Sequence, residues 1–168
     1  MEYRKANQPE GVNLLASIMI CYREISAVFY EPKNRTVKIT FTVNKLMDEK
    51  SFNEIATLLD ESIHTYHMIS GIPFMPIEFT METQGAHAFL HIIRDLETLS
   101  NGELAIIASI MRDSMGDSLI MGDTALDEEI LEMQEENLEN MLLATHAMQL
   151  RHSLVGVREG DAVMVYDK

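Results

Sequence analysis

The sequence predicts an α+β protein, in which helices cover an antiparallel sheet built from hairpins. Segments with alternating apolar and polar residues occur in pairs separated by turn-forming residues, as expected for β-hairpins. Other segments place apolar residues at three- and four-residue spacing, which is typical of amphipathic helices. The length of 168 residues and the apolar content of 46% are sufficient for a packed core.

These two kinds of segment define the expected elements. Hairpins are expected at about residues 24–43, 76–95 and 153–166. Helices are expected at about residues 51–69, 101–115 and 124–149. We interpret residues 1–168 as a single domain, with a ββαββ half at about 12–98 and a helical half with a closing hairpin at about 100–168.

Before the first hairpin the pattern is ambiguous. Residues 1–11 are polar and end in Pro-Glu-Gly, which we interpret as a frayed terminus. Residues 13–22 fit either a short helix or a strand, and periodicity does not decide between them. The hairpin itself is clear, because the apolar residues of 36–43 alternate with Thr and Lys and a turn-forming segment, 31–35, precedes them.

The first two helices are expected to begin at capping boxes. Ser51 with Glu54, and Ser100 with Glu103, have the spacing in which a serine hydroxyl and a glutamate cap the first turn of a helix. Gly71 and Pro73 are expected to end the first of these helices.

The third helix divides into an apolar half and an acidic half. Its apolar residues cover about half of a helical wheel, and glutamates spaced four apart, such as Glu128 and Glu132, repel each other on the opposite side. A stripe this broad requires an apolar partner, which is either the domain's own sheet or the same helix of a second copy. The expected interaction surface contains Leu126, Ile130, Met133, Leu138 and Met141.

The negative charge is concentrated in the same part of the chain. The formal net charge is −14, and residues 113–150 contain ten acidic residues and no basic residue. Such a field repels phosphate groups, which argues against binding to nucleic acid or to an anionic membrane. An unidentified basic protein partner is compatible with this charge, as is a solvated helix face that keeps the protein soluble.

The first predicted helix carries a candidate site for a divalent metal ion. Glu61, His64 and His67 lie at three-residue steps, and di-iron helical bundles use Glu-x-x-His pairs. The chain lacks a second such pair, so a site here would hold one ion and take a third ligand from His87 or His91. On a strand these two histidines are about 13 Å apart, so one ion cannot take both. The competing interpretation is that the histidines lie at the surface or in hydrogen bonds.

A short segment resembles a hydrolase motif. Gly116-Asp117-Ser118-Leu119, followed by Gly122, resembles the nucleophile block of the GDSL family of esterases and lipases, over seven residues. The resemblance implies that Ser118 is a nucleophile. The family takes its catalytic Asp and His from an Asp-x-x-His sequence, which this chain lacks, and here the block follows a predicted helix rather than the first strand. The competing interpretation is a helix C-cap at Gly116 and a turn after it.

Together these features favour a cytoplasmic protein-interaction or regulatory module that forms a homodimer. Cys21 is the single cysteine, which suits a reducing compartment, and no apolar stretch reaches the roughly 18 residues of a membrane span. The 13 methionines are spread along the chain and suit an adaptable apolar surface. The alternative is an enzyme that acts on a small molecule or uses the metal site, and hydrolysis through Ser118 is a third hypothesis. No other cofactor is expected, and neither a substrate nor a partner can be read from the sequence.

Overall fold

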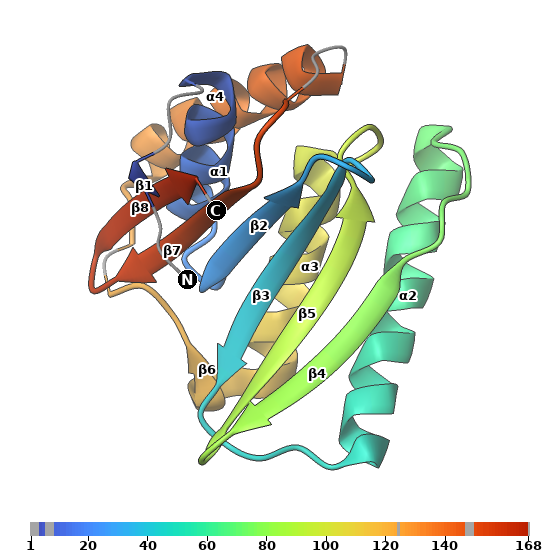
Figure 1. Ribbon diagram of the computed structural model, residues 1–168. Coiled ribbons are helices and arrows are strands. Elements are labelled where there is room, and N and C mark those ends of the chain that lie inside the picture. The colour runs from blue at the N-terminus through green and yellow to red at the C-terminus, as the bar shows by residue number, and fades with distance from the viewer. Residues whose placement is uncertain (1–3, 6–8, 124, 147–149, 168) are drawn as a thin grey trace.

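The chain forms four helices and eight strands within residues 4–5, 9–123, 125–146 and 150–167, which a computed structural model describes (Figure 1). The helices are α1 (Pro9–Cys21), α2 (Glu49–Ser70), α3 (Asn101–Met115) and α4 (Glu128–His146). The strands are β1 (Arg4–Lys5), β2 (Ala27–Glu31), β3 (Thr36–Val43), β4 (Glu78–Gln84), β5 (His87–Asp95), β6 (Leu119–Ile120), β7 (Leu154–Glu159) and β8 (Ala162–Asp167).

The strands pair in antiparallel fashion in one sheet. Seven of them form a row in the order β1-β8-β7-β2-β3-β5-β4, and β6 pairs with β3 outside this row. The hairpins β2–β3, β4–β5 and β7–β8 lie in the three segments that the sequence predicts, which confirms the α+β fold class. The pairing of β2 with β7, in which Phe29 lies opposite Val155, joins the first hairpin to the last.

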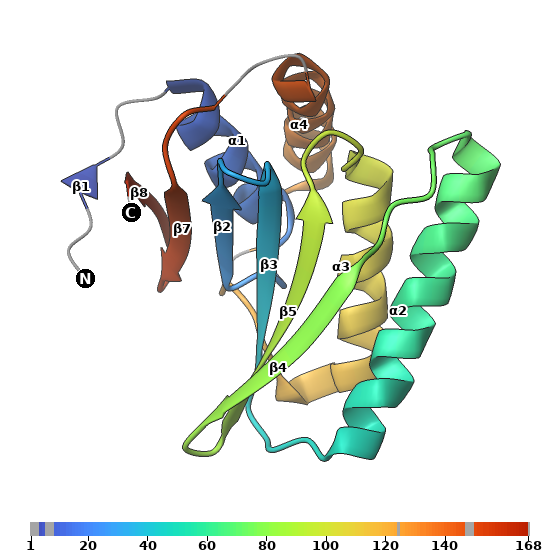
Figure 2. The same ribbon diagram turned by 45° about the vertical axis from the view of Figure 1, so that its right-hand side comes forward.

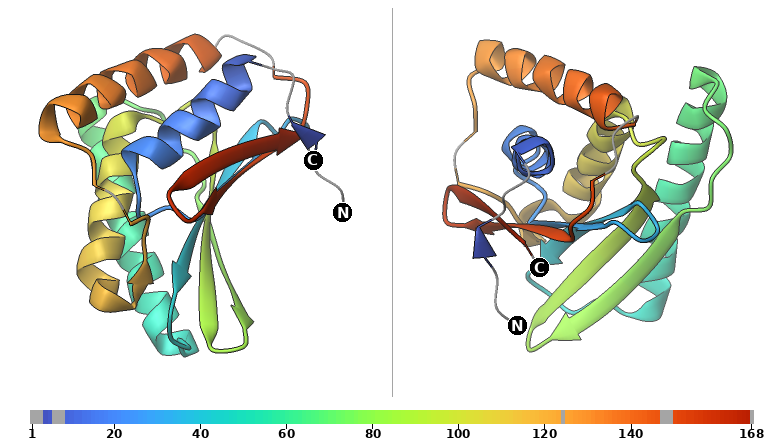
Figure 3. Two further views of the ribbon diagram at one scale, coloured as in Figure 1. Left: turned by 90° about the vertical axis from the view of Figure 1, so that its left-hand side faces the viewer. Right: turned by 45° about the horizontal axis from the view of Figure 1, so that its top comes forward.

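The four described helices lie on one face of the sheet, and the opposite face is free of helices (Figure 2). α2 and α3 pack against each other and cover the part of the sheet made by β3, β5 and β4. α1 packs against β7 and β8, and α4 packs on the far side of α1 (Figure 3). The molecule therefore has two layers at one end of the sheet and three at the other.

Residues 13–21 belong to α1, which settles the choice between helix and strand. Leu14, Leu15, Ile18 and Met19 have no exposed surface, because the sheet covers one side of α1 and α4 covers the other. A helix covered on two sides lacks the polar stripe that makes a helical period visible. The expectation of a frayed terminus is wrong for residues 9–11, since α1 begins at Pro9, and proline suits the first turn of a helix.

The helix caps agree with the sequence at two of three positions. The Ser100 hydroxyl accepts a hydrogen bond from the amide of Glu103 at 3.3 Å, and Gly71 ends α2 with a φ of +71°, as predicted. The other half of the capping box predicted at Ser100 is wrong, because the Glu103 carboxylate is bonded to Arg94 and not to the cap. Ser51 is not the N-cap of α2. The helix begins at Glu49 instead, and the Asp48 carboxylate accepts a hydrogen bond from the Ser51 amide at 2.8 Å. Aspartate caps a helix as well as serine does, so the predicted cap is displaced by three residues.

α4 occupies the central part of the predicted 124–149 helix, of which residues 124 and 147–149 lie outside the described residues. The side chains of Leu138, Leu142 and Thr145 are buried, and the principal contacts of the helix are with α1. The apolar stripe therefore meets another helix of the same chain, which is neither of the two partners expected from the sequence. Within the described ranges, no helix combines the length and the apolar character that crossing a bilayer requires.

We expect Leu138→Ala to destabilise the protein far more than Leu143→Ala on the same helix. Leu138 has no exposed surface, whereas Leu143 is 62% exposed. Truncating a buried leucine lowers the free energy of unfolding by about 2–5 kcal/mol, and truncating an exposed one lowers it by about 0.5 kcal/mol or less. Urea denaturation followed by circular dichroism measures both losses. Equal losses would show that α4 does not pack on α1 through Leu138.

Candidate functional site

The three residues predicted as metal ligands lie on α2 in different surroundings. Glu61 is exposed, and the half-buried ring of His64 stacks on Phe74 with 4.7 Å between the ring centroids. The Nδ1 atom of His64 lies 3.3 Å from a carboxylate oxygen of Asp60. His67 is only 2% exposed. In the described part of the chain, no three His, Cys, Asp or Glu side chains are placed so that they could hold one metal ion.

His67 belongs to a buried ion cluster, which we define as His67, Arg94 and Glu103. The Glu103 carboxylate accepts two hydrogen bonds from Arg94, at 2.6 Å from Nε and 2.8 Å from Nη2, and a third contact from Nε2 of His67. Arg94 and Glu103 have no exposed surface. Asp95 also pairs with Arg94, and Thr98 accepts a hydrogen bond from Arg94 Nη2 at 3.0 Å. The cluster ties α2, β5 and the first turn of α3 together.

This environment gives His67 a structural role. The Arg94 guanidinium lies 3.3 Å from His67 Nε2, so its positive charge would repel a metal ion at that nitrogen. From the sequence, Glu103 was assigned only to a helix cap and Arg94 was not singled out, although a signal for Arg94 was present. Arg94 continues the inward-facing register of Leu90 and Ile92 in β5, and an arginine at an apolar position indicates a buried partner.

The two other candidate ligands lie on the helix-free face of the sheet. His91 Nδ1 is hydrogen-bonded to Thr40 Oγ1 at 2.8 Å, and its Nε2 lies 3.4 Å from a carboxylate oxygen of Glu82. Burial and then Lys38 lower the pKa of His91, and Glu82 opposes this shift, so the ring is neutral at pH 7. His87 is half-buried at the start of the same strand.

The segment that resembles the GDSL block forms the turn between α3 and β6. Gly116 ends α3 with a φ of +54°, which confirms the C-cap interpretation. Gly116–Ser118 is a 3₁₀ turn, and the backbone carbonyl of Ser118 accepts a hydrogen bond from Asn44 at 2.7 Å. Within the described ranges the Ser118 hydroxyl has no hydrogen bond to a histidine, so the structure provides no base for a nucleophile there.

The predicted interaction surface on α4 and the segment before it is split between the interior and the solvent. Leu138 is buried, and the half-buried Met141 accepts a hydrogen bond from the Ser17 hydroxyl at 3.3 Å. Leu126 is half-buried. Ile130 and Met133 are 41% and 55% exposed. Only these last two residues are available to a partner without a change in the fold.

Among the described residues, the apolar side chains with the largest exposed fractions lie at the end of α2 and in the loop that follows it. We define the α2 end patch as Met68, Ile69 and Phe74, which are 77%, 81% and 73% exposed. Residues 68–77 contain no charged side chain. This patch was not predicted from the sequence, although an uncharged run between a helix end and a strand is an unusual feature in so acidic a chain.

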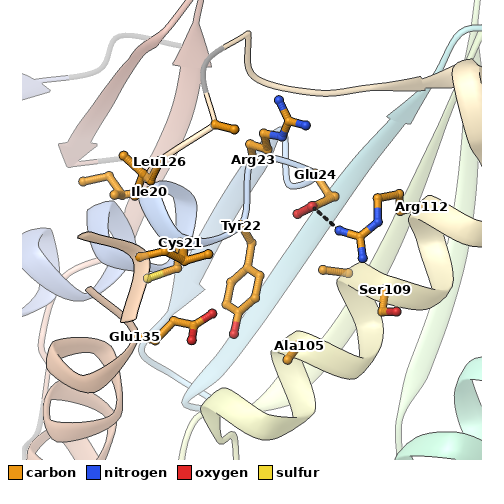
Figure 4. Close-up of a pocket in the computed structure, with 13 residues that line it drawn as sticks. Ile20, Cys21, Tyr22, Arg23, Glu24, Ala105, Ser109, Arg112, Leu126 and Glu135 are labelled. Carbon is orange, nitrogen blue, oxygen red and sulfur yellow. Dashed lines mark hydrogen bonds and ion pairs between the residues drawn. The ribbon is translucent and has the colours of Figure 1, made fainter. Parts of the chain in front are cut away.

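A pocket of about 270 Å³ lies between the end of α1, α3 and the start of α4 (Figure 4). Cys21, Tyr22 and Glu24 line it from α1 and the turn after it, Arg112 lines it from α3, and Glu135 lines it from α4. The Tyr22 hydroxyl donates a hydrogen bond to the side chain of Asn101, and Arg112 Nη1 donates one to Glu24 at 3.4 Å.

Two weakly acidic groups in the pocket, the Cys21 thiol and the Tyr22 hydroxyl, have raised pKa values. Burial, with a further contribution from Glu135, raises the pKa of the Cys21 thiol to about 12. Burial and then Glu135 also raise the pKa of Tyr22 well above its ordinary value. Cys21 is therefore a protonated thiol at pH 7 and does not act as a nucleophile in this conformation.

Comparisons with models of protein families, with curated proteins and with solved structures find no match for this chain. Any indication of function therefore comes from the side chains and surfaces of the protein itself. Two of these have features that a fold alone does not require, namely the α2 end patch and the pocket beside α1.

Replacing Arg94 by alanine should strongly destabilise the protein. The variant leaves the Glu103 carboxylate buried without its main partner, and breaking a buried ion pair costs about 3–5 kcal/mol. Arg151→Ala, at an exposed position, should cost about 1 kcal/mol or less. Combining Arg94→Met with Glu103→Leu removes both charges and should recover part of the loss. Urea denaturation compares these variants, and an Arg94→Ala variant as stable as Arg151→Ala would contradict the structural role of the cluster.

Cys21 should react slowly with iodoacetamide in the folded protein. Its pKa of about 12, against an ordinary value of 9.0, means about a thousandfold less thiolate near pH 8 than in the unfolded chain. We expect the rate to rise about tenfold for each pH unit until the protein unfolds. Mass spectrometry of labelling with and without urea measures the ratio. Fast labelling of the native protein would mean that the thiol is not buried as described.

Proposed function

We propose that this protein is a cytoplasmic protein-interaction module that forms a homodimer through the α2 end patch. The observation that carries the proposal is the exposure of three large apolar side chains, between 73% and 81%, in a run of ten residues without charge. Contiguous apolar patches on a folded surface are typical of protein interfaces. The free thiol of Cys21 supports a reducing compartment.

The patch is suited to association because its residues are already ordered, so that burying them costs little conformational entropy. Phe74 is already stacked on His64, and the His64 Nε2 atom lies 3.4 Å from the Met75 carbonyl oxygen, so the loop after α2 is tied to the helix. Each large apolar side chain that leaves water contributes about 1.5–3 kcal/mol. When a surface is ordered before it binds, less of this free energy is offset by the entropy cost of ordering side chains and loops.

Charge explains why a second copy fits this patch. Each copy carries a net charge of −14, so two copies repel each other at most orientations. An isologous contact across residues 68–77 brings an uncharged surface against itself, and screening over roughly 8 Å weakens the repulsion between the more distant acids. Self-association therefore costs less here than at the acidic surface of α4.

The exposed residues of α4 are a less suitable contact. Ile130 and Met133 lie among the exposed Glu128, Glu129 and Glu132, and a two-fold contact there would place like charges against each other. These glutamates suit a basic protein partner instead. The α2 end patch is therefore our choice for the contact between copies, and the α4 surface is a second site that the same experiment tests.

Sedimentation velocity over a range of concentrations should show a weak monomer–dimer equilibrium. The ten residues of the uncharged run are fewer than the roughly 20–30 residues per side of a standard interface, which predicts weak association. The double variant Ile69→Ser and Phe74→Ser should be monomeric at every concentration, because it removes the apolar centre of the contact. Its circular dichroism should match that of the wild type, since both side chains are exposed.

Two further variants serve as controls. Leu143→Ser, at a position 62% exposed on α4, should leave the equilibrium unchanged. Ile130→Ser with Met133→Ser should also leave it unchanged if the α2 end patch is the contact. A wild-type chain that stays monomeric, or a double variant at residues 69 and 74 that dimerises as well as the wild type, would overturn the proposal.

A further inference from the structure

One nitrogen of the His91 ring is buried and has no hydrogen bond. His91 lies in β5 on the helix-free face of the sheet and is 7% exposed. Its Nδ1 atom is hydrogen-bonded to Thr40 Oγ1 at 2.8 Å, whereas its Nε2 atom has no hydrogen-bond partner among the described residues. Buried polar atoms are almost always paired, so an unpaired one marks a position where a ligand atom would be stabilised.

The bond to Thr40 determines that this nitrogen is a donor. The ring is neutral at pH 7, because burial and then Lys38 lower the pKa of His91, and it therefore carries one hydrogen. The Thr40 side chain is buried, and within the described ranges His91 Nδ1 is the acceptor that its hydroxyl meets. If Nδ1 carried the hydrogen, the hydroxyl hydrogen of Thr40 would be left without an acceptor. The hydrogen is therefore assigned to Nε2.

An acceptor lies beside this donor without forming a hydrogen bond to it. A carboxylate oxygen of Glu82 is 3.4 Å from His91 Nε2, beyond the roughly 2.7–3.2 Å of an N–H···O hydrogen bond. The Glu82 side chain is 73% exposed and belongs to β4, the last strand of the row, so it can turn without disturbing the core. A donor and an acceptor therefore lie next to each other, and each has capacity for a further partner.

The strand register places a strip of small side chains beside this pair. Ala27 in β2 lies opposite Thr40 in β3, and Thr42 lies opposite Phe89 in β5. The larger side chains of Phe29 and Phe89 line the same hollow from β2 and β5. The result is a pocket of about 470 Å³, which the donor and the acceptor also line. This volume lies within the range of roughly 300–1,000 Å³ that is usual for small-molecule sites.

The charges around the pocket favour a neutral ligand. An anionic group at His91 Nε2 would lie against the Glu82 carboxylate, and a cationic group offers no acceptor for the Nε2 hydrogen. Lys38 lines the pocket with its ammonium 4.5 Å from the centre of the Phe29 ring, so its charge also disfavours a cation. Arg158 lines the pocket as well, but its guanidinium is bonded to main-chain carbonyl oxygens.

From these contacts we propose that the pocket on the helix-free face of the sheet binds a neutral, planar aromatic molecule that carries a carboxamide group. The carbonyl oxygen accepts the hydrogen of His91 Nε2, the amide nitrogen donates to Glu82, and the ring lies over the small side chains of β2 and β3. A carboxamide presents an acceptor and a donor side by side, which complements the adjacent donor and acceptor of the protein. This site is separate from the α2 end patch, and the proposal does not depend on dimer formation.

Titration of the ¹⁵N-labelled protein with benzamide, followed by NMR, tests the proposal. We expect saturable shifts of the backbone amides of β2, β3 and β5 around the pocket, and no saturable shifts with sodium benzoate or benzylammonium chloride. Glu82→Ala should weaken benzamide binding about tenfold or more, because it removes the charged acceptor. Glu78→Ala, on the same face of β4, should leave the affinity unchanged. Both glutamates are exposed, so both variants should fold.

A steric variant tests the location independently of the polar groups. Ala27→Leu fills the floor of the pocket and should abolish binding, whereas Ala162→Leu, at an exposed position in β8, should not. The proposal fails if benzamide gives no saturable shifts with the wild type, or if the shifts lie away from β2, β3 and β5. It also fails if Glu82→Ala or Ala27→Leu leaves the affinity unchanged, or if benzoate or benzylammonium binds as tightly as benzamide.

Discussion

The pairing of β2 with β7 is the interaction on which the rest of the structure depends. It joins the hairpin that follows α1 to the hairpin that ends the described chain, and four residue pairs hold it in register. This pairing places β7 and β8 beneath α1, which in turn presents its outer side to α4. Without it, the N-terminal helix would have no sheet to cover, and α4 would have no helix to pack on.

Local sequence patterns predicted most helices and strands. Features that depend on contacts between distant segments were not predicted. The alternation in residues 36–43 and the glycine at residue 71 determine structure within a few positions, so the hairpins and the end of α2 were correct. The state of residues 13–21 depends on being covered from two sides, which no local pattern encodes. For the same reason, the partner of the α4 stripe could not be chosen from the sequence, because it lies in the segment whose state was ambiguous.

For the same reason, the surroundings of the candidate site residues could not be predicted from the sequence. The spacing of His64 and His67 is a property of one helix, whereas the surroundings of His67 are set by Arg94 on a strand and Glu103 on another helix. Glu103 illustrates why: its backbone amide takes part in the predicted cap, while its side chain turns into the core rather than back to the cap. The uncharged run at residues 68–77 became meaningful only once the exposure of its apolar side chains was known.

Because α4 packs on α1 and not on the sheet, its position affects how the native state partially unfolds. Its main contacts are with α1, so it can separate without breaking any strand pairing. At its C-terminal end, Arg35 donates to the His146 carbonyl oxygen at 3.3 Å, and His146 Nε2 lies 3.1 Å from the carbonyl oxygen of Leu99, so that end is tied to the body of the molecule. Separation therefore begins at the first turns, where neighbouring glutamates repel each other. We therefore expect α4 to open as a sub-global unfolding unit, with its amides exchanging with solvent while the sheet stays intact.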